Sequence, residues 1–298
     1  MIFGFPPSFW LGLVVNGLAT GGAYALFAAG LTIIFGVVGI LNFAQGEFFM
    51  VGGFVAFFIS QNLGWGYWVS LVLTTAVMAA VGAGSYYGMF RRLQRSPRAV
   101  EVGLVTTLGL SILLQNGFTI LFGAIPRSPN NSLLNDNVVV GGVDTGVLML
   151  IALGISIVAL GGLHLFLKRS RLGLAIRGVP QNRELAAIIG VSSAKVTTTA
   201  LAVGMGLTGL AAAAIIPFYG VFPTMGTGFV FTGFAIVVIA GFGSIGGAIV
   251  IALLLGVVMS VAGGGFSASA QDAAPLVLMT AALLVRPNGL VKRAVRAQ

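Results

Sequence analysis

The stretch LNFAQGEFFMVGG, residues 41–53, lies in an otherwise long apolar run. It contains one carboxylate, that of Glu47, and two amides, those of Asn42 and Gln45. A charged side chain at the centre of a membrane is costly, and such residues usually face the interior of a helix bundle or a water-filled cavity. These three side chains are therefore the first candidates for a functional site.

The composition of the whole chain indicates a membrane protein. Hydrophobic residues make up 58% of its 298 residues, charged residues only 7%, and the mean hydropathy is +1.07. Soluble domains carry about 25% charged residues. A helix needs about 20 apolar residues to cross the hydrocarbon core, and the runs of or near this length are 10–38, 68–90, 103–125, 146–167, 196–222 and 227–262. We therefore predict an all-α, polytopic transmembrane helical bundle that forms a single domain over residues 1–298.

Basic residues set the expected orientation. They gather in three clusters, 91–98, 168–195 and 286–296, and loops rich in Lys and Arg are cytoplasmic. The loop 123–145 has one Arg and two Asp, so we place it outside. With the N-terminus outside, these sides fit nine crossings, or eight if one glycine-rich segment is re-entrant. Orientation explains the net charge of +9 better than nucleic acid binding does, so we expect no nucleic acid partner.

Glycine is abundant, with 45 residues in the chain. In a membrane, small residues let helix backbones approach closely, and this drives helix association. Three glycine pairs have GxxxG spacing, for which we predict tight helix packing: Gly17/Gly21, Gly84/Gly88 and Gly243/Gly247.

Several kinds of chemistry are excluded. Cysteine is absent, and the single histidine, His164, cannot form a multi-histidine metal site, so we expect no metal, no catalytic residue and no role in chemistry for His164. No GxxxxGK[ST] motif occurs, so we expect no ATP site and no enzyme activity of the chain itself. The stretch GFGSIG, 241–246, matches GxGxxG, but transmembrane-type sequence surrounds it instead of a βαβ unit. We therefore expect no cofactor.

The longest polar cytoplasmic loop, 169–195, contains a predicted short helix. Residues 182–189, NRELAAII, have the composition of a helix, and their apolar side chains fall on one face: Leu185, Ile188 and Ile189. A short amphipathic helix must bury that face on the membrane surface, on its own bundle or on a partner.

Three stretches together resemble a known family. They are ILNFAQGEFFMVGGF (40–54), SRLGLAIRGVPQNRELAAIIGVSSAKV (170–196) and GFGSIGGAIVIALLLG (241–256). In combination they resemble the LivH-like permease subunits of ABC importers for branched-chain amino acids. The resemblance extends from about residue 10 to about residue 292.

The resemblance implies a function and a set of partners. Such a permease lies in the bacterial inner membrane and moves branched-chain or related small amino acids inward by alternating access. The implied partners are cytoplasmic ATP-binding subunits, an extracytoplasmic substrate-binding protein and a second permease, either LivM-like or a second copy of this chain. Membrane lipid surrounds the assembly.

The resemblance also implies a role for the short helix of the loop 169–195. In ABC importers a coupling helix of this kind docks in a groove of the ATPase subunit. The residues that we assign to it, four of which echo the family's EAA–G pattern, are Arg183, Glu184, Ala186, Ala187 and Gly190. The alternative is a helix that lies on lipid, because the nearby basic residues suit lipid phosphates as well as a partner.

The polar cluster at 42–47 cannot act as one group on a straight helix. Asn42 and Gln45 share a face, whereas Glu47 is turned about 200° from Gln45. Either the helix is broken or re-entrant near 40–53, with the break near Gly46, or Glu47 faces a different neighbour from the amides. Broken helices are tolerated at depth only where they line protein or a cavity.

Three roles remain open for these polar residues. They line the translocation pathway, or they lie at the shallow cytoplasmic interface, or they form a structural lock. In a lock, Glu47 caps freed backbone NH groups or pairs with an arginine of a partner permease. We favour the lock, because ABC importers take their specificity largely from a separate binding protein.

Two other classes of transporter compete with this interpretation. One is a secondary transporter driven by an ion gradient, in which Glu47, Glu101 and Asp272 are the candidate coupling residues. The other is a facilitator for a small polar solute, including urea or short amides. The arginine-rich loop with its short helix argues against both.

Overall fold

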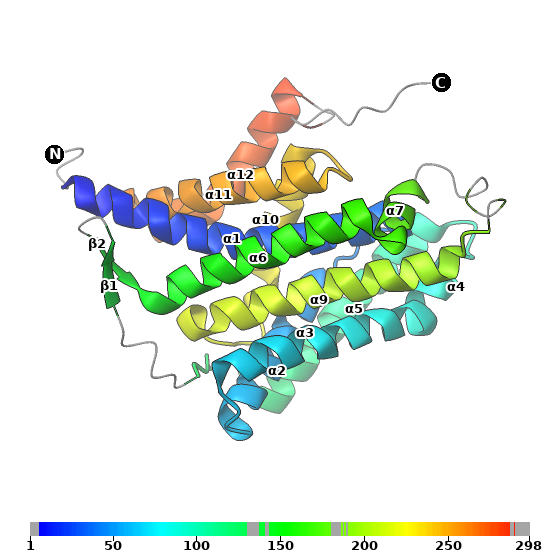
Figure 1. Cartoon of the computed structure of the whole chain (residues 1–298), viewed down its shortest axis with the longest axis horizontal. Coiled ribbons are helices and arrows are strands. Elements are labelled where there is room, and N and C mark those ends of the chain that lie inside the picture. The colour runs from blue at the N-terminus through cyan, green and yellow to red at the C-terminus, as the bar shows by residue number, and fades with distance from the viewer. Residues whose placement is uncertain are drawn as a thin grey trace.

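The fold is a bundle of helices, most of which run along its long axis (Figure 1). The computed structural model describes residues 6–129, 137–140, 143–179, 186, 188, 190–286 and 289. In chain order the elements are α1 (Pro7–Val38), α2 (Gln45–Phe57), the π-helical turn η1 (Phe58–Asn62), α3 (Gly66–Ser85), the π-helical turn η2 (Tyr86–Phe90), α4 (Arg91–Leu93), α5 (Ala99–Phe122), the antiparallel strands β1 (Asn137–Val140) and β2 (Val143–Gly146), α6 (Val147–Arg169), α7 (Arg171–Gly178), α9 (Ser193–Tyr219), α10 (Met225–Ala240), α11 (Ile245–Gly265) and α12 (Ala268–Val285).

Within the described residues, seven helices are long and apolar enough to cross a membrane. They are α1, α3 with its continuation to Leu93, α5, α6, α9, α11 and α12. Helix α10 is apolar but shorter, and α2 has 13 residues. These findings confirm the predicted polytopic helical bundle. The sequence fits eight or nine crossings depending on whether the short helices α2 and α10 are both counted.

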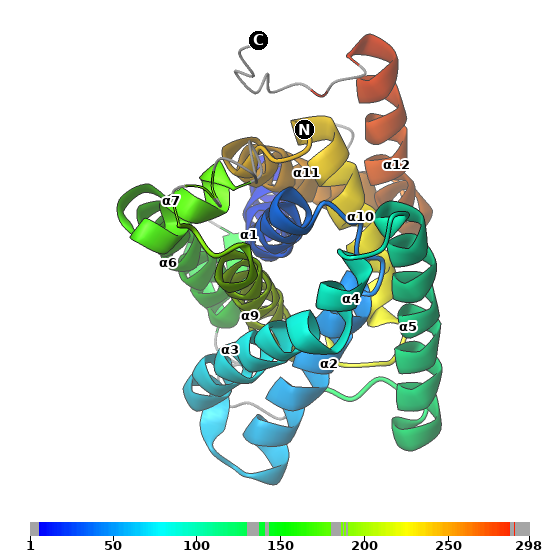
Figure 2. The ribbon, with the colours of Figure 1, turned by 90° about the vertical axis from the view of Figure 1, so that its right-hand side faces the viewer.

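Helices α1 and α9 form the centre of the bundle (Figure 2). Helix α1 packs on α11, α9 and α6, while α9 also packs on α3 and α2. Glycines permit this close packing: a methyl group at Gly30 would meet the backbone of Gly204 across the α1–α9 contact. Helices α5 and α12, by contrast, leave most of their surface exposed.

The GxxxG pairs have different surroundings. Gly17 and Gly21 pack against the backbone of α11, as predicted. Gly84 and Gly88 face open space, so the prediction of helix packing is wrong for this pair within the described part of the chain. Gly243 lies in the turn between α10 and α11 with φ of 83°, a conformation that glycine adopts without strain.

The two ends of the bundle differ in charge. Arg91 and Arg92 in α4 lie at the same end as Lys168 and Arg169, the last residues of α6, and the β1–β2 hairpin lies at the opposite end (Figure 1). This arrangement agrees with the expected orientation, in which the basic clusters are cytoplasmic and the loop 123–145 is external.

Candidate functional site

Two long helices are each followed by a short connection and a shorter helix. Helix α1 ends at Val38 and is followed by Gly39, whose φ is 75°, and α2 begins at Gln45. Helix α9 ends at Tyr219 and is followed by Gly220, whose φ is 66°, and α10 begins at Met225. A left-handed residue at the end of a helix strongly favours glycine, because glycine has no Cβ to clash with the backbone. The two glycines therefore end the long helices and turn the chain back into the bundle.

The two short helices run in opposite directions. Helix α2 follows α9, because Gln45 contacts Thr208 near the middle of α9 and Gly53 contacts Ile216 further along. Helix α10 follows α1, because the ring of Phe229 packs on Tyr24 and that of Phe242, just after α10, packs on Phe35. Since Gly30 contacts Thr208 and Ile34 contacts Gly204, α1 and α9 are antiparallel. The short helices therefore diverge from a common point inside the bundle.

The first turns of α2 and α10 meet at that point. A Cβ at Gly46 would collide with the carbonyl group of Gly226, and a Cβ at Gly226 would collide with that of Gly46. One turn further along, the rings of Phe49 and Phe229 stack with their centroids 3.9 Å apart. The contact is reciprocal, so we call this meeting point of the two helix starts the half-helix junction.

The observed break differs in position from the predicted one. The non-helical segment covers residues 39–44, so the helix is interrupted before Gln45 and not near Gly46. Gly46 lies in the first turn of α2, where the lack of a side chain serves the contact with Gly226. The expected break near 40–53 is present, but a different glycine, Gly39, produces it.

The two amides form one buried hydrogen-bonded chain. Asn42 Nδ2 donates to Gln45 Oε1 at 3.0 Å, and Gln45 Nε2 donates to Thr208 Oγ1 at 2.6 Å. The Thr208 hydroxyl donates in turn to the Gly204 carbonyl at 3.0 Å. The three side chains are fully buried. They tie the segment 39–44 to the start of α2 and to the middle of α9.

Glu47 faces a different neighbour from the two amides, which was the second of the two alternatives predicted from the sequence. Its side chain is only 2% exposed, and its Oε1 accepts a hydrogen bond of 2.8 Å from Ser111 Oγ of α5. Its Oε2 has no hydrogen-bond partner among the described residues and lies beside Gly226 in the first turn of α10. The starts of both short helices thus present their positive dipole ends to this carboxylate.

Helix α5 touches the junction with one polar face. Thr107 Oγ1 donates to the Leu41 carbonyl at 3.3 Å, and Gln115 Nε2 donates to Thr227 Oγ1 at 3.5 Å. With Ser111 between them, these residues recur every four positions and therefore lie on one face of the helix. We call Thr107, Ser111 and Gln115 the α5 seam.

The segment after α9 is held by the loop that follows α5. Arg127 and Val221 exchange two backbone hydrogen bonds, of 3.0 Å and 2.7 Å. Residues 39–44 and 220–224 are therefore both joined to α5 or to the loop that follows it.

Sequence reasoning missed the α5 seam and Thr208. Polar residues at four-residue spacing within an apolar helix are nevertheless a detectable signal.

The arrangement is suited to holding groups in place rather than to covalent chemistry. Within the described residues, no group of three or more His, Cys, Asp or Glu side chains could hold a metal ion. Two buried acceptors, Asn42 Oδ1 and Glu47 Oε2, have no hydrogen-bond partner among the described residues. Such acceptors can receive hydrogen bonds from a donor that approaches the half-helix junction.

The predicted coupling residues are only partly described. Arg183, Glu184 and Ala187 lie outside the described residues. Ala186 is helical and buried, and its carbonyl accepts a hydrogen bond of 2.9 Å from the Val191 amide. Gly190 has φ of 81°, which is typical of the residue that ends a helix.

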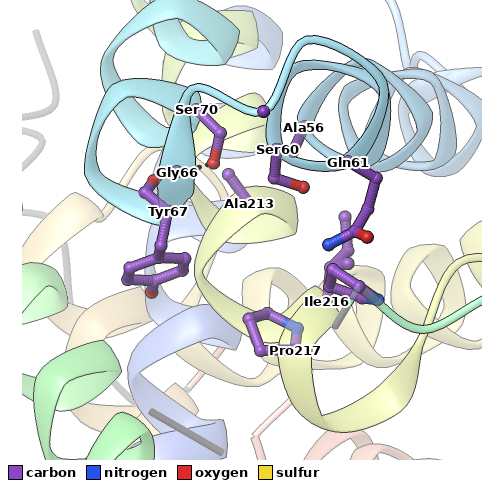
Figure 3. Close-up of a pocket in the computed structure, with 11 residues that line it drawn as sticks. Ala56, Ser60, Gln61, Gly66, Tyr67, Ser70, Ala213, Ile216 and Pro217 are labelled. Atoms are coloured by element: carbon purple, nitrogen blue, oxygen red, sulfur yellow. Dashed lines mark hydrogen bonds between the residues drawn. The ribbon is translucent and has the colours of Figure 1, made fainter. Parts of the chain in front are cut away.

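A separate cavity of about 250 Å³ lies between η1, the start of α3 and the end of α9 (Figure 3). Its lining includes Ser60, Gln61 and Ser70, and Pro217 of α9. Proline has no amide hydrogen, so Pro217 leaves the carbonyl of Ala213 without its usual helical donor. No charged residue lines this cavity, which makes the half-helix junction the better candidate for a functional site.

The chain was compared with known proteins. Residues 13–285 match the family described as "Branched-chain amino acid transport system / permease component". The chain is 31% identical to the high-affinity branched-chain amino acid transport system permease protein BraD of Pseudomonas aeruginosa, over 95% of this chain and 96% of that protein. It is 29% identical to the corresponding permease protein LivH of Escherichia coli K12, over 96% of each chain. A probable LivH of Methanocaldococcus jannaschii is 25% identical over 89% of this chain and 87% of its own length.

No solved structure matches the chain. The family match, however, covers all the membrane-competent helices except the first residues of α1. It includes the half-helix junction, the α5 seam and the loop 169–195. The chain therefore belongs to the family of permease components of branched-chain amino acid transport systems.

Proposed function

We propose that this chain is the membrane-spanning subunit of an ABC-type importer that moves branched-chain or related small amino acids inward. The observation that carries the proposal is the family match over residues 13–285. Paired half-helices occur in several classes of transporter, whereas this family consists of components of transport systems. The chain is a multi-pass protein of the inner membrane.

Separate ATPase subunits supply the energy in this proposal. The chain has no P-loop motif, and the relatives are named as permease proteins of larger systems. Alternating access then follows from closure of the ATPase subunits beneath the bundle. An external binding protein delivers the amino acid at the opposite end.

The coupling element is the segment with Arg183, Glu184, Ala186, Ala187 and Gly190. One observation supports this assignment. The side chain of Ile188 is 79% exposed, although it is apolar and lies in a cytoplasmic loop. A helix that leaves such a side chain uncovered needs a surface to cover it, and a groove on an ATPase subunit provides one.

The polar cluster acts as a structural lock in this proposal. Asn42 and Gln45 join the segment 39–44 to α9, and Glu47 joins α2 to Ser111 of α5. Helix α5 buries little of its own surface, so these polar contacts hold it against the half-helix junction.

A second permease, LivM-like or a second copy of this chain, covers α5. Its outward face carries exposed apolar side chains, including Ile112, Leu113 and Ile120, together with the half-buried Thr106 and the exposed Asn116. Lipid alone would favour a purely apolar face. A partner helix can satisfy both kinds of side chain.

Affinity purification of the tagged chain from its native membrane tests the proposal. We expect ATP-binding subunits, a second permease and, in the presence of amino acid, a binding protein to co-purify. Substitution within 183–190 should remove the ATP-binding subunits and leave the chain in the membrane. A single-chain preparation that still transports along an ion gradient would instead show an ion-coupled transporter.

A further inference from the structure

A cavity of about 760 Å³ lies at the basic end of the bundle. One wall is formed by α6 and α7, and the other by the turn before α11 and its first residues. The face of α6 that lines it combines two kinds of side chain. Leu160, Leu163 and Leu167 form an apolar surface, and His164 and Lys168 follow the same face toward the end of the helix.

The charged side chains among the described residues that line this cavity have one sign. Lys168 and Arg177 line it from α6 and α7, together with His164, and no acidic residue is among the described residues that line it. The first amide groups of a helix have no partner within the helix and carry its positive dipole end. Helix α11 presents this end to the cavity through Ile245 and Gly246, while its Gly247 amide donates to the capping Ser244 Oγ at 3.2 Å.

The start of α11 is open toward the cavity. A Cβ added at Gly246 would meet nothing within 4 Å, and neither would one added at Gly178 on the opposite wall. Deeper in the cavity, Leu160 of α6 and Ile249 of α11 are apolar. The cavity is thus positively charged near the helix ends and apolar toward the interior of the membrane.

We propose that this cavity binds an anionic phospholipid. Lys168, Arg177 and the start of α11 surround the headgroup phosphate, and the acyl chains lie along Leu160 and Ile249. Basic pockets between transmembrane helices on the cytoplasmic side bind anionic headgroups. The assignment does not depend on transport, so a negative result for lipid binding would leave the proposed function unaffected.

The apolar part of the lining favours a lipid over a free phosphate. A soluble phosphate ester would use Lys168 and Arg177 but would leave Leu160 and Ile249 in contact with water. A lipid satisfies both parts at once, because its headgroup and its chains are joined at the depth where the membrane-competent part of α6 ends. His164, from which no chemistry is expected, contributes a donor at the border between the two parts.

The test is a titration of the delipidated full-length chain in detergent, followed by native mass spectrometry. Dioleoyl phosphatidylglycerol is compared with dioleoyl phosphatidylcholine. The variant Lys168→Gln/Arg177→Gln removes the two permanent charges. Its control is Arg91→Gln/Arg92→Gln, which removes two exposed arginines of α4 at the same end of the bundle.

We expect the wild type and the control to prefer phosphatidylglycerol. The cavity variant should bind it about 30-fold more weakly, roughly five-fold for each cation. A further variant, Gly246→Phe, fills the cavity without removing a charge and should also lose the lipid while keeping the wild-type elution profile.

Three results would overturn the proposal. The first is equal binding of the two lipids by the wild type. The second is an equal loss of binding in the cavity variant and in the α4 control. The third is displacement of phosphatidylglycerol by inorganic phosphate or by a purified ATPase subunit at comparable concentration, which would assign the cavity to that occupant.

Discussion

The carboxylate of Glu47 lies between three helices. It accepts a hydrogen bond from Ser111 of α5, belongs to the first turn of α2 and lies beside the first turn of α10. A charge buried within a membrane protein must be compensated by such neighbours. This environment explains why an acid occurs in an apolar stretch, and it makes the contribution of each neighbour measurable.

Ser111→Ala should destabilise the protein. It removes the hydrogen-bond donor to Glu47 Oε1, and loss of a hydrogen bond to a charged group costs about 1.5–3 kcal/mol. The control is Thr106→Ala on the same helix, whose hydroxyl donates to the Val102 carbonyl at an exposed site. The melting temperature in detergent should fall for Ser111→Ala only. Equal melting temperatures together with impaired transport would favour a pathway role for this contact.

Glu47→Gln tests the lock against a pathway-lining role. Glutamine keeps an acceptor for Ser111 but loses the attraction of the negative charge to two helix starts, about 0.3–1 kcal/mol for each. The lock predicts lower recovery of the partner subunits after purification. Glu101→Gln, at an exposed acid of α5, is the control and should leave recovery unchanged. Intact assembly with altered uptake in Glu47→Gln would indicate that Glu47 only lines the pathway.

At the scale of elements, the half-helix junction depends on backbone contact. Helices α2 and α10 approach so closely at Gly46 and Gly226 that neither position accommodates a side chain. The connections before them, 39–44 and 220–224, are attached to α5 and to Arg127 in the loop that follows it. Movement of α5 would therefore displace the starts of both short helices together.

Gly46→Ala and Gly226→Ala should each disturb the junction. The added methyl group collides with the opposite backbone, and overpacking typically costs about 1–3 kcal/mol. Gly84→Ala is the matched control, because a Cβ there faces open space in α3. Size-exclusion chromatography of detergent extracts should show less folded protein for the two junction variants only. An equal yield of all three proteins would contradict the close contact.

The coupling segment is the second element with a specific test. Glu184→Arg or Ala187→Asp should abolish transport while the chain still inserts in the membrane, because either change alters the surface offered to the ATPase. Arg95→Asp, at an exposed site of the same end, is the control. Uptake is measured in cells and insertion by membrane fractionation. Normal uptake in the coupling variants would remove the assignment.

At the scale of the whole molecule, burial is uneven. Helices α1 and α9 are largely covered, whereas α5 and α12 are not, and α5 and α6 lie on opposite sides of the bundle (Figure 2). Since α5 contacts the first turns of both short helices, through Ser111 to Glu47 and through Gln115 to Thr227, a partner on its outer face would act on the junction. This is the geometric reason to place the second permease there.

Cysteine crosslinking locates that partner directly. The chain has no cysteine, so Leu113→Cys on α5 and Val158→Cys on α6 each introduce a single thiol at a strongly exposed site. We expect a bifunctional thiol reagent to join Leu113→Cys to the second permease in native membranes and to leave Val158→Cys uncrosslinked. Crosslinking from α6 alone would move the interface to the opposite side.

The sequence by itself determined the class of fold, the family and the polar residues that matter. Apolar runs of spanning length, basic clusters and the stretch 41–53 are local signals, because membrane insertion and hydrogen-bonding capacity depend on residue type along the chain. Asn42, Gln45 and Glu47 all proved to be buried at one junction. Their composition alone made them stand out.

Only the tertiary structure decided what these residues contact. Sequence spacing could not place the break at Gly39 rather than at Gly46, since both are glycines within one apolar run. It also could not pair Gly46 with Gly226, or Glu47 with Ser111, because these partners are far apart in the chain. Their contacts arise from the packing of α2, α5 and α10, and long-range packing is set by the shape of the whole bundle and not by local pattern.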